Sequence, residues 1–217
     1  MTGIERLLSL AAINDEHGVR LRAHQNRFNE YRQRHLTGTS PKAVTGFNLF
    51  QTPPEIAENM AQIILKQIKK GSRILEPSVG LGRLVEPFTK EELDELKLQW
   101  ESVEESAECI RALRTGLKRL QKTHEADFLQ MSSTDLGGKF DAIIMNPPFK
   151  MGSDIKHINH AYSMLKPGGI LVSLCYNGVK QNKELKPLAT TWEVLPEKSF
   201  ASEGTDASVA LLTLKNN

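Results

Sequence analysis

The chain has 217 residues, enough for one sizeable α/β domain with its own core. Its formal charge of +2 neither requires nor excludes a nucleic-acid partner. Its two cysteines lie far apart in apolar stretches, which argues against a disulfide framework or a cysteine-based metal site and fits a reducing cytosol. No apolar run is long enough to span a bilayer, and the start lacks the layout of a signal peptide.

Residues 1–40 are expected to form a helical, basic extension, and residues 41–217 the main domain. Apolar spacing predicts helices over residues 4–13 and about 15–35. The second helix carries a basic stripe opposed by a single acid, Glu30; its members are Arg20, Arg22, Arg27, Arg32, Arg34 and, just beyond the helix, Lys42. Such a stripe is either a solvated helix face or a surface that follows a phosphate backbone.

The next helix is expected from Pro53 to about Lys69. Thr52 and Glu55 have the spacing of a capping box, and a proline at the first helical position loses only a hydrogen that would be unpaired anyway. The amino end of this helix could hold a carboxylate, because its N–H groups carry partial positive charge. The alternative is an ordinary, well-capped helix.

A short strand, 73–76, is followed by a glycine loop with Gly80 and Gly82, and then by an expected apolar helix. Glycines let the backbone approach a ligand closely, and the carboxylate of Glu76 would attract an ammonium or hydroxyl group rather than a phosphate. The third glycine of the dinucleotide-binding pattern is replaced by Val85, which counts against a pyrophosphate cofactor and a dehydrogenase.

A second strand is expected over 96–103, followed by a helix over 107–120. Glu104 and Glu105 come at the end of this strand, where doubly wound folds bind ribose hydroxyls; alternatively they only favour the positive end of the next helix. A short third strand over 122–126 leads to Asp127.

The fourth strand, 140–145, ends at Asn146-Pro147-Pro148-Phe149. Two prolines cannot donate backbone hydrogen bonds and force the preceding residues out of the helical region, so the strand must stop there. Asn146 then offers an amide oxygen beside the flat face of Phe149, a pocket suited to a planar heterocycle with an amino group. The alternative is a rigid loop with Phe149 as a core residue.

The rest of the chain predicts a helix over 157–165 and strands over 170–175, 191–195 and 208–214, with short loops over 149–156 and 176–190. Alternating strands and helices predict a mostly parallel sheet with right-handed crossovers. Four polar residues would meet at one edge of it: Glu76, Glu104, Asp127 and Asn146. His157 and His160 lack a carboxylate pattern and are expected on the surface, without a metal.

Over about residues 46–215 the chain resembles class I S-adenosylmethionine-dependent amino-methyltransferases, most closely the adenine-N6 DNA methyltransferases. The similarity is carried by the loop from Glu76 to Gly82, the tetrapeptide from Asn146 to Phe149, and the segment from Phe47 to Pro53. The resemblance implies a Rossmann-like fold whose seven-stranded, mostly parallel sheet has an antiparallel last strand.

The resemblance also implies S-adenosylmethionine as the cofactor. Glu104 would accept hydrogen bonds from the ribose hydroxyls, and Glu76 would face the methionine ammonium. Asp127 would accept a hydrogen bond from the adenine amine, and Phe128 would lie against the adenine ring. The other residues implied at the cofactor are Phe47, Thr52, Pro77, Ser78, Gly80, Gly82 and Asn146.

For catalysis, the resemblance implies a target base flipped into the pocket. Asn146 and the carbonyl of Pro147 would accept its two amino hydrogens, and Phe149, following Pro148, would stack on its ring. No metal or covalent intermediate is needed, and the absence of a cysteine nucleophile near this loop argues against carbon-5 methylation of cytosine.

The substrate expected from the resemblance is adenine in DNA, in a bacterial or phage-infected cytosol. No insert is long enough for a separate target-recognition domain, so sequence specificity should be low, and the expected contacts to nucleic acid are Arg20, Arg27, Arg34, Lys180 and Lys183. An RNA base is the first alternative, and a protein glutamine the second. A catalytically silent module that binds the cofactor or DNA is the non-enzyme alternative.

Overall fold

The computed structural model describes residues 50–116 and 122–216. The two helices expected before residue 40, the stripe residues Arg20, Arg27 and Arg34, and the cofactor candidate Phe47 lie outside this described part. The boundary expected between residues 40 and 41 lies outside it as well. The described residues belong to one compact unit that begins at Phe50.

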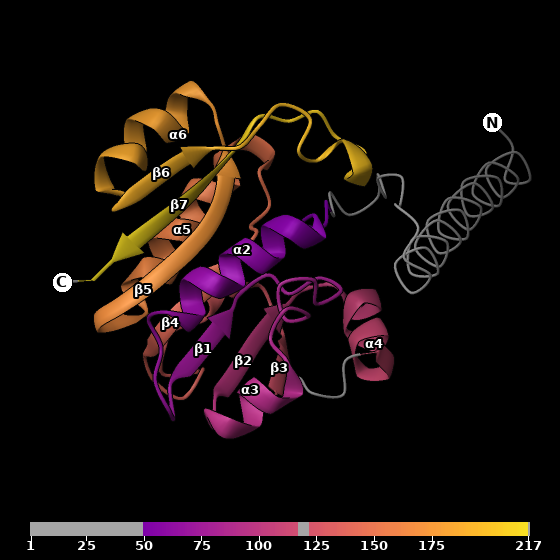
Figure 1. Ribbon diagram of the computed structural model, residues 1–217, viewed down its shortest axis with the longest axis vertical. Coiled ribbons are helices and arrows are strands. Elements are labelled where there is room, and N and C mark those ends of the chain that lie inside the picture. The colour runs from indigo at the N-terminus through magenta and orange to yellow at the C-terminus, as the bar shows by residue number, and fades with distance from the viewer. Residues whose placement is uncertain (1–49, 117–121, 217) are drawn as a thin grey trace, which may run out of the picture. The chain divides into compact units, whose positions relative to one another are not determined.

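A single seven-stranded sheet organises the described residues (Figure 1). Its strands are β1 Arg73–Glu76, β2 Gln99–Glu104, β3 Lys122–Glu125, β4 Phe140–Met145, β5 Leu165–Tyr176, β6 Thr191–Val194 and β7 Val209–Lys215. They lie in the order β3-β2-β1-β4-β5-β7-β6. β1 to β5 pair in parallel, whereas β7 is antiparallel to both of its neighbours. The fold expected from the sequence is therefore confirmed.

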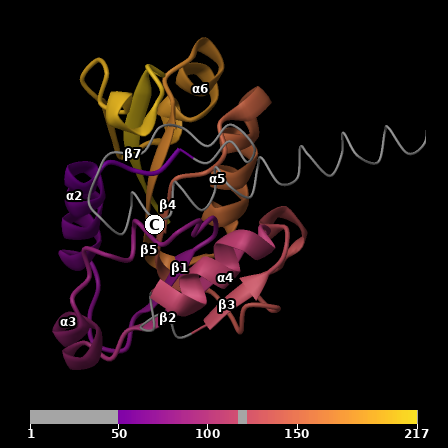
Figure 2. The same cartoon turned by 90° about the vertical axis from the view of Figure 1, so that its right-hand side faces the viewer.

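Five α-helices are described around this sheet: α2 Pro54–Leu65, α3 Lys90–Glu95, α4 Ala107–Gly116, α5 Ser153–Ser163 and α6 Val179–Glu184. Each face of the sheet has its own apolar core, because successive strand residues point to opposite faces. In β1, Ile74 packs into the core on the α2 side and Leu75 into the core on the α5 side. Figure 2 shows α2 and α5 on opposite sides of the central strands.

α2 begins one residue later than expected and ends at Leu65. The expected capping box is not formed: the N-cap residue is Pro53, and no side chain caps the helix. Thr52 is only 1% exposed, and its hydroxyl accepts a hydrogen bond from Asn146 instead. The side chain of Thr52, which the local sequence predicts to cap α2, therefore forms a hydrogen bond with a residue distant in the sequence instead.

The prediction of an apolar helix after the glycine loop is wrong. Residues 77–88 form successive turns, in which Val85 N–H donates to the carbonyl of Gly82 and Phe88 N–H to that of Val85. Pro87 explains the difference, because a proline removes a helical hydrogen bond and disfavours helical backbone in the residue before it. Leu84, Val85 and Phe88 are still buried, so the segment satisfies the apolar pattern without a helix.

Other boundaries also differ from the sequence expectation, among them the start of β5 at Leu165 rather than residue 170. β2 begins at Gln99 rather than Leu96, because Leu96 is the C-cap of α3 and Lys97 has a φ of 47°. α5 begins at Ser153, four residues before His157. The expected loop over 176–190 contains α6 and a 3-10 turn over Lys186–Leu188.

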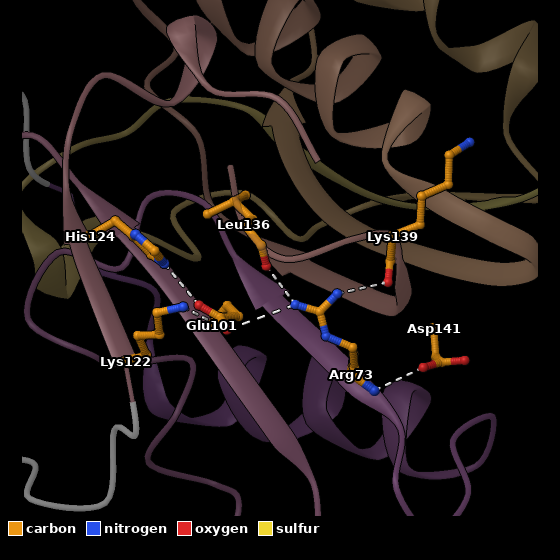
Figure 3. Close-up of polar contacts among 7 residues, drawn as sticks. All are labelled: Arg73, Glu101, Lys122, His124, Leu136, Lys139 and Asp141. Carbon is orange, nitrogen blue, oxygen red and sulfur yellow. Dashed lines mark hydrogen bonds and ion pairs between the residues drawn. The ribbon is translucent and has the colours of Figure 1, made fainter. Parts of the chain in front are cut away.

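Arg73 connects the strands at the edge of the sheet where β1 and β4 begin (Figure 3). Its guanidinium donates to the carbonyl of Leu136 at 2.6 Å and to that of Lys139 at 3.2 Å, and it lies 3.7 Å from the carboxylate of Glu101. Glu101 also contacts the side chains of Lys122 and His124 from β3. This network is structural, because the polar residues expected to bind a ligand gather at the opposite ends of the strands.

Candidate functional site

Polar side chains follow the carboxyl ends of four neighbouring parallel strands. Glu76 ends β1, Glu104 ends β2, Asp127 follows β3 and Asn146 follows β4. β1 and β4 are adjacent in the sheet although the chain visits β2 and β3 between them. Such a reversal of strand order opens a crevice at the carboxyl ends, which is where ligands bind in open α/β sheets. The four residues expected at one edge are therefore together there.

Asn146 is held in one orientation by the segment that precedes α2. Its Nδ2 donates to the carbonyl of Phe50 at 3.0 Å and to the hydroxyl of Thr52 at 3.1 Å. Both amide hydrogens are thus used, and a reversed amide would set two oxygens against each other at Phe50. The Oδ1 atom remains as an acceptor, with no hydrogen bond from the described residues. Phe50 was not expected at the site, because a backbone carbonyl leaves no sequence signal.

The loop after Asn146 combines a buried and an open part. Pro147 is buried, whereas Phe149 is partly buried and packs against the core on the α2 side. This position agrees in part with the alternative that Phe149 is a core residue. The chain then makes a 3-10 turn over Lys150–Gly152 before α5 begins.

Glu76 is a buried carboxylate with an unpaired oxygen. The side chain is 1% exposed, and its Oε2 has no hydrogen-bond partner in the described part of the chain. Burial raises the pKa of Glu76 well above its ordinary value, and the nearby carboxylates of Glu104 and Glu86 raise it further. A buried anion that is left without a cation is costly, so this position is suited to a positively charged ligand group.

Glu104 organises the glycine loop. Its Oε2 accepts from the N–H of Gly80 at 2.8 Å, and its Oε1 accepts from the N–H of Ser106 at 2.9 Å. Burial raises the pKa of Glu104, while these two backbone hydrogen bonds lower it. Each oxygen keeps a further lone pair for a hydroxyl donor. Gly80 has a φ of 53°, a backbone conformation that a larger residue adopts only with strain.

Asp127 and Phe128 have different environments. Asp127 is exposed, and one of its oxygens accepts from the N–H of Leu129 at 2.9 Å, which leaves the other available. Phe128 is only 3% exposed, with its ring against the rings of His157 and His160 at centroid distances of 6.1 and 4.9 Å. Its ring therefore packs inside the α5 side of the fold and offers almost no face to a ligand.

The histidines and cysteines have structural positions. His157 is buried rather than on the surface as expected: its Nδ1 donates to the carbonyl of Ser153 at 2.8 Å, and its ring lies near that of Phe128. Burial raises the pKa of Cys109 to about 12 and that of Cys175 further, so neither thiol is an accessible nucleophile. In residues 50–116 and 122–216 no group of His, Cys, Asp and Glu could hold a metal ion, and none of their helices meets the length and apolarity needed to cross a membrane.

The sequence matches one protein-family model, described as "Methyltransferase small domain", over residues 57–200. A comparison with curated proteins found no match. The match spans β1 to β6 and therefore includes Glu76, Glu104, Asp127 and Asn146.

Solved structures of low sequence identity share the fold. One is a Listeria monocytogenes protein classed as a class I S-adenosylmethionine-dependent methyltransferase, with a TM-score of 0.62, 21% identity, and coverage of 78% of this chain and 62% of that one. A type I restriction-modification methyltransferase subunit from Streptococcus thermophilus has a TM-score of 0.63, 20% identity, and coverage of 77% and 44%. A third is the 16S rRNA N2 G1207 methyltransferase RsmC of T. thermophilus, in complex with AdoMet and guanosine. It has a TM-score of 0.54, 18% identity, and coverage of 79% of this chain and 45% of that one. The chain thus spans less than two thirds of each of these proteins.

Proposed function

The chain belongs to the methyltransferase small domain family and has the class I fold, and from this premise we propose that it is an S-adenosylmethionine-dependent enzyme that methylates the N6 amino group of adenine in DNA with low sequence specificity. The observation that carries the proposal is the fixed amide of Asn146, whose Oδ1 is kept as a hydrogen-bond acceptor by Phe50 and Thr52. An acceptor at this position suits an amino group and not a ring carbon.

The residues at the edge of the sheet fit S-adenosylmethionine. When bound, this cofactor supplies an electrophilic methyl group on a sulfonium. Its ammonium would pair with Glu76, whose Oε2 has no partner in the described part of the chain and whose pKa is raised by burial and by the carboxylates of Glu104 and Glu86. Its ribose hydroxyls would donate to the remaining lone pairs of Glu104, and its adenine amine to the open oxygen of Asp127.

Other cofactor contacts belong to the same proposal. Pro77, Ser78, Gly80 and Gly82 lie in the turns that follow Glu76, and both glycines have positive φ values. Because the N–H of Gly80 donates to Glu104 and that of Gly82 to the carbonyl of Val79, these glycines would allow close approach of the backbone rather than supply donors. Thr52 uses its oxygen to accept from Asn146 and so keeps its own hydrogen for the methionine carboxylate. Phe47 stays a prediction, and Phe128 would contribute through its backbone, since its ring is buried.

The proposed chemistry of the protein is the activation of an amine. Oδ1 of Asn146 and the carbonyl oxygen of Pro147 accept the two amino hydrogens of the base, which draws electron density onto the nitrogen and weakens its conjugation with the ring. Phe149 packs on one face of the base, worth about 1–3 kcal/mol for an aromatic contact. The nitrogen would then take the methyl group in line, at a reacting distance of about 3–3.5 Å. The new nitrogen–carbon bond would form as the carbon–sulfur bond of the sulfonium breaks, a neutral thioether would leave, and the extra proton of the amine would pass to solvent.

Nucleic acid is favoured over a protein substrate by residue type and charge. Phe149 offers a purely apolar ring for a base, whereas a glutamine methylase should prefer tyrosine there. Arg20, Arg27, Arg34, Lys180 and Lys183 are the proposed phosphate contacts, and both lysines are exposed on α6. RNA is the second candidate, because one structural neighbour acts on ribosomal RNA while another is a subunit of a DNA restriction-modification system.

Asn146→Ala tests the proposal. Loss of a positioned electrostatic group in an active site lowers turnover by about 100-fold or more, so methyl transfer into DNA should fall by that factor while calorimetry shows the cofactor still bound. Asn159→Ala, an exposed asparagine on α5, is the matched control and should keep normal turnover. If Asn146→Ala keeps near-full turnover with bound cofactor, the proposed chemistry is wrong.

A further inference from the structure

Two apolar side chains are almost fully exposed in the described part of the chain. Met151 is 92% exposed and Val179 is 90% exposed. Single exposed apolar residues are ordinary, but these two come from loops that lie against each other. A side chain added at Gly152 would lie 3.5 Å from Nζ of Lys180 and 3.7 Å from its Cδ, so the segment after Met151 contacts the segment after Val179.

Hydrogen bonds of Asp154 hold the segment after Met151 and the segment after Val179 together. Its side chain is fully buried and accepts hydrogen bonds from the N–H of Tyr176 at 3.0 Å and from Nε2 of Gln181 at 3.0 Å. These bonds join the first turn of α5 to the end of β5 and to α6. Met151 and Val179 are therefore presented on ordered backbone. We call Lys150, Met151, Val179 and Lys180 the Met151 platform.

The Met151 platform directly follows the loop from Asn146 to Phe149 in the sequence. Gly152 N–H donates to the carbonyl of Phe149 at 3.3 Å, which closes the turn that carries Lys150 and Met151. Met151 has a φ of 54° and a ψ of 28°, a left-handed conformation that costs about 1 kcal/mol for a residue other than glycine. The fold therefore keeps a strained and exposed methionine two residues from Phe149.

The charge around the Met151 platform is positive. Lys150, Lys180 and Lys183 are all exposed, and Lys186 follows just after α6. They are opposed by one exposed acid, Glu184, because the carboxylate of Asp154 is buried. Cations beside apolar side chains are the combination that binds a nucleic-acid strand, since cations contact phosphates and apolar side chains contact base faces. The same combination fits neither an acidic peptide, which needs no apolar wedge, nor a small anion.

We propose that the Met151 platform binds the DNA strand beside the target base, with Met151 and Val179 against the faces of neighbouring bases and Lys150 and Lys180 on the flanking phosphates. The proposal rests on the proposed function for the identity of the strand. An apolar wedge of this kind fills the space that a flipped base leaves and keeps the duplex open. It would supply contacts that do not depend on the base sequence.

Met151→Gly separates binding from folding. Glycine adopts a positive φ without strain, so this variant should unfold at a temperature equal to or above that of the wild type. Its affinity for a fluorescein-labelled duplex of about 20 base pairs, measured by anisotropy with S-adenosylhomocysteine present, should fall about 5- to 10-fold, and Val179→Ser should act in the same direction. Lys180→Glu should reduce the dependence of log affinity on log salt by about 1.

The controls are Leu188→Ser, which changes an apolar side chain that is 62% exposed but outside the platform, and Lys139→Glu, at the opposite end of β4. Both should bind as the wild type does. Normal duplex affinity in Met151→Gly and Val179→Ser, or equal losses in the controls, would overturn the platform.

Because anisotropy requires no turnover, the two proposals can fail separately. If duplex DNA binds in a way that depends on Met151 but no N6-methyladenine forms, the proposed function is refuted and the proposal for the Met151 platform is supported. Normal methylation of DNA by Met151→Gly would refute the platform and keep the function. An RNA strand that binds with the same dependence on Met151 would keep the surface and change the substrate.

Discussion

Thr52→Val tests whether the orientation of Asn146 matters for turnover. The substitution conserves shape at a site that is 1% exposed and removes only the hydroxyl that accepts from Nδ2 of Asn146 at 3.1 Å. Losing one neutral hydrogen bond costs about 1 kcal/mol, and leaving the amide hydrogen unpaired costs about as much again. If the orientation of Asn146 that turnover requires becomes less stable by this total of about 1–2 kcal/mol, turnover should fall about 5- to 30-fold.

The assay is single-turnover transfer of a labelled methyl group into DNA at saturating cofactor, with Thr52→Ser as the control. Serine keeps the hydroxyl and should restore most of the activity. Calorimetry adds a separate readout: a weaker cofactor affinity in Thr52→Val would support the additional contact between Thr52 and the methionine carboxylate. Turnover of Thr52→Val equal to that of the wild type would refute the positioning of Asn146 by Thr52.

Three further substitutions distinguish effects on stability from effects on cofactor binding. Because burial raises the pKa of Glu76 in the folded state, the wild type should lose stability as pH rises above the ordinary glutamate pKa of about 4.3 and toward the raised value. Glu76→Gln should therefore gain in melting temperature over the wild type at pH 8 more than at pH 5 without cofactor, yet bind S-adenosylmethionine more weakly; an equal difference at both pH values would contradict this. Glu104→Lys should abolish cofactor binding in calorimetry, and unchanged affinity would remove Glu104 from the site. Arg73→Met should cost about 2–3 kcal/mol through two lost hydrogen bonds, or about 5–10 °C in melting temperature by circular dichroism, without changing cofactor affinity.

The strands and their order of appearance could be predicted from the sequence where apolar runs stop at residues with clear backbone effects. β4 ends at Asn146 because two prolines follow, and β1 ends at Glu76 before Pro77 and the glycine loop. These stops also placed Glu76 and Asn146 at one edge, since the carboxyl ends of parallel strands meet there. Local signals were sufficient for this part of the site.

Contacts between distant segments account for the errors. The hydroxyl of Thr52 is used by Asn146 and not by the end of α2, and no local pattern near Thr52 indicates this. α6 is six residues long, too short to be stable by itself, and it forms because Gln181 reaches the buried carboxylate of Asp154. The ring of Phe128 packs against α5 instead of facing a ligand, because His157 and His160 enclose it.

The activity proposed for the site around Asn146 is methylation of the amino group of adenine in DNA. The most direct measurement incubates the full chain with labelled S-adenosylmethionine and separate DNA, RNA and protein fractions, followed by nucleoside mass spectrometry of each labelled product. N6-methyladenine should form in DNA and should be lost in Asn146→Ala. Label confined to RNA or protein, or a methyl group on cytosine carbon, would contradict it.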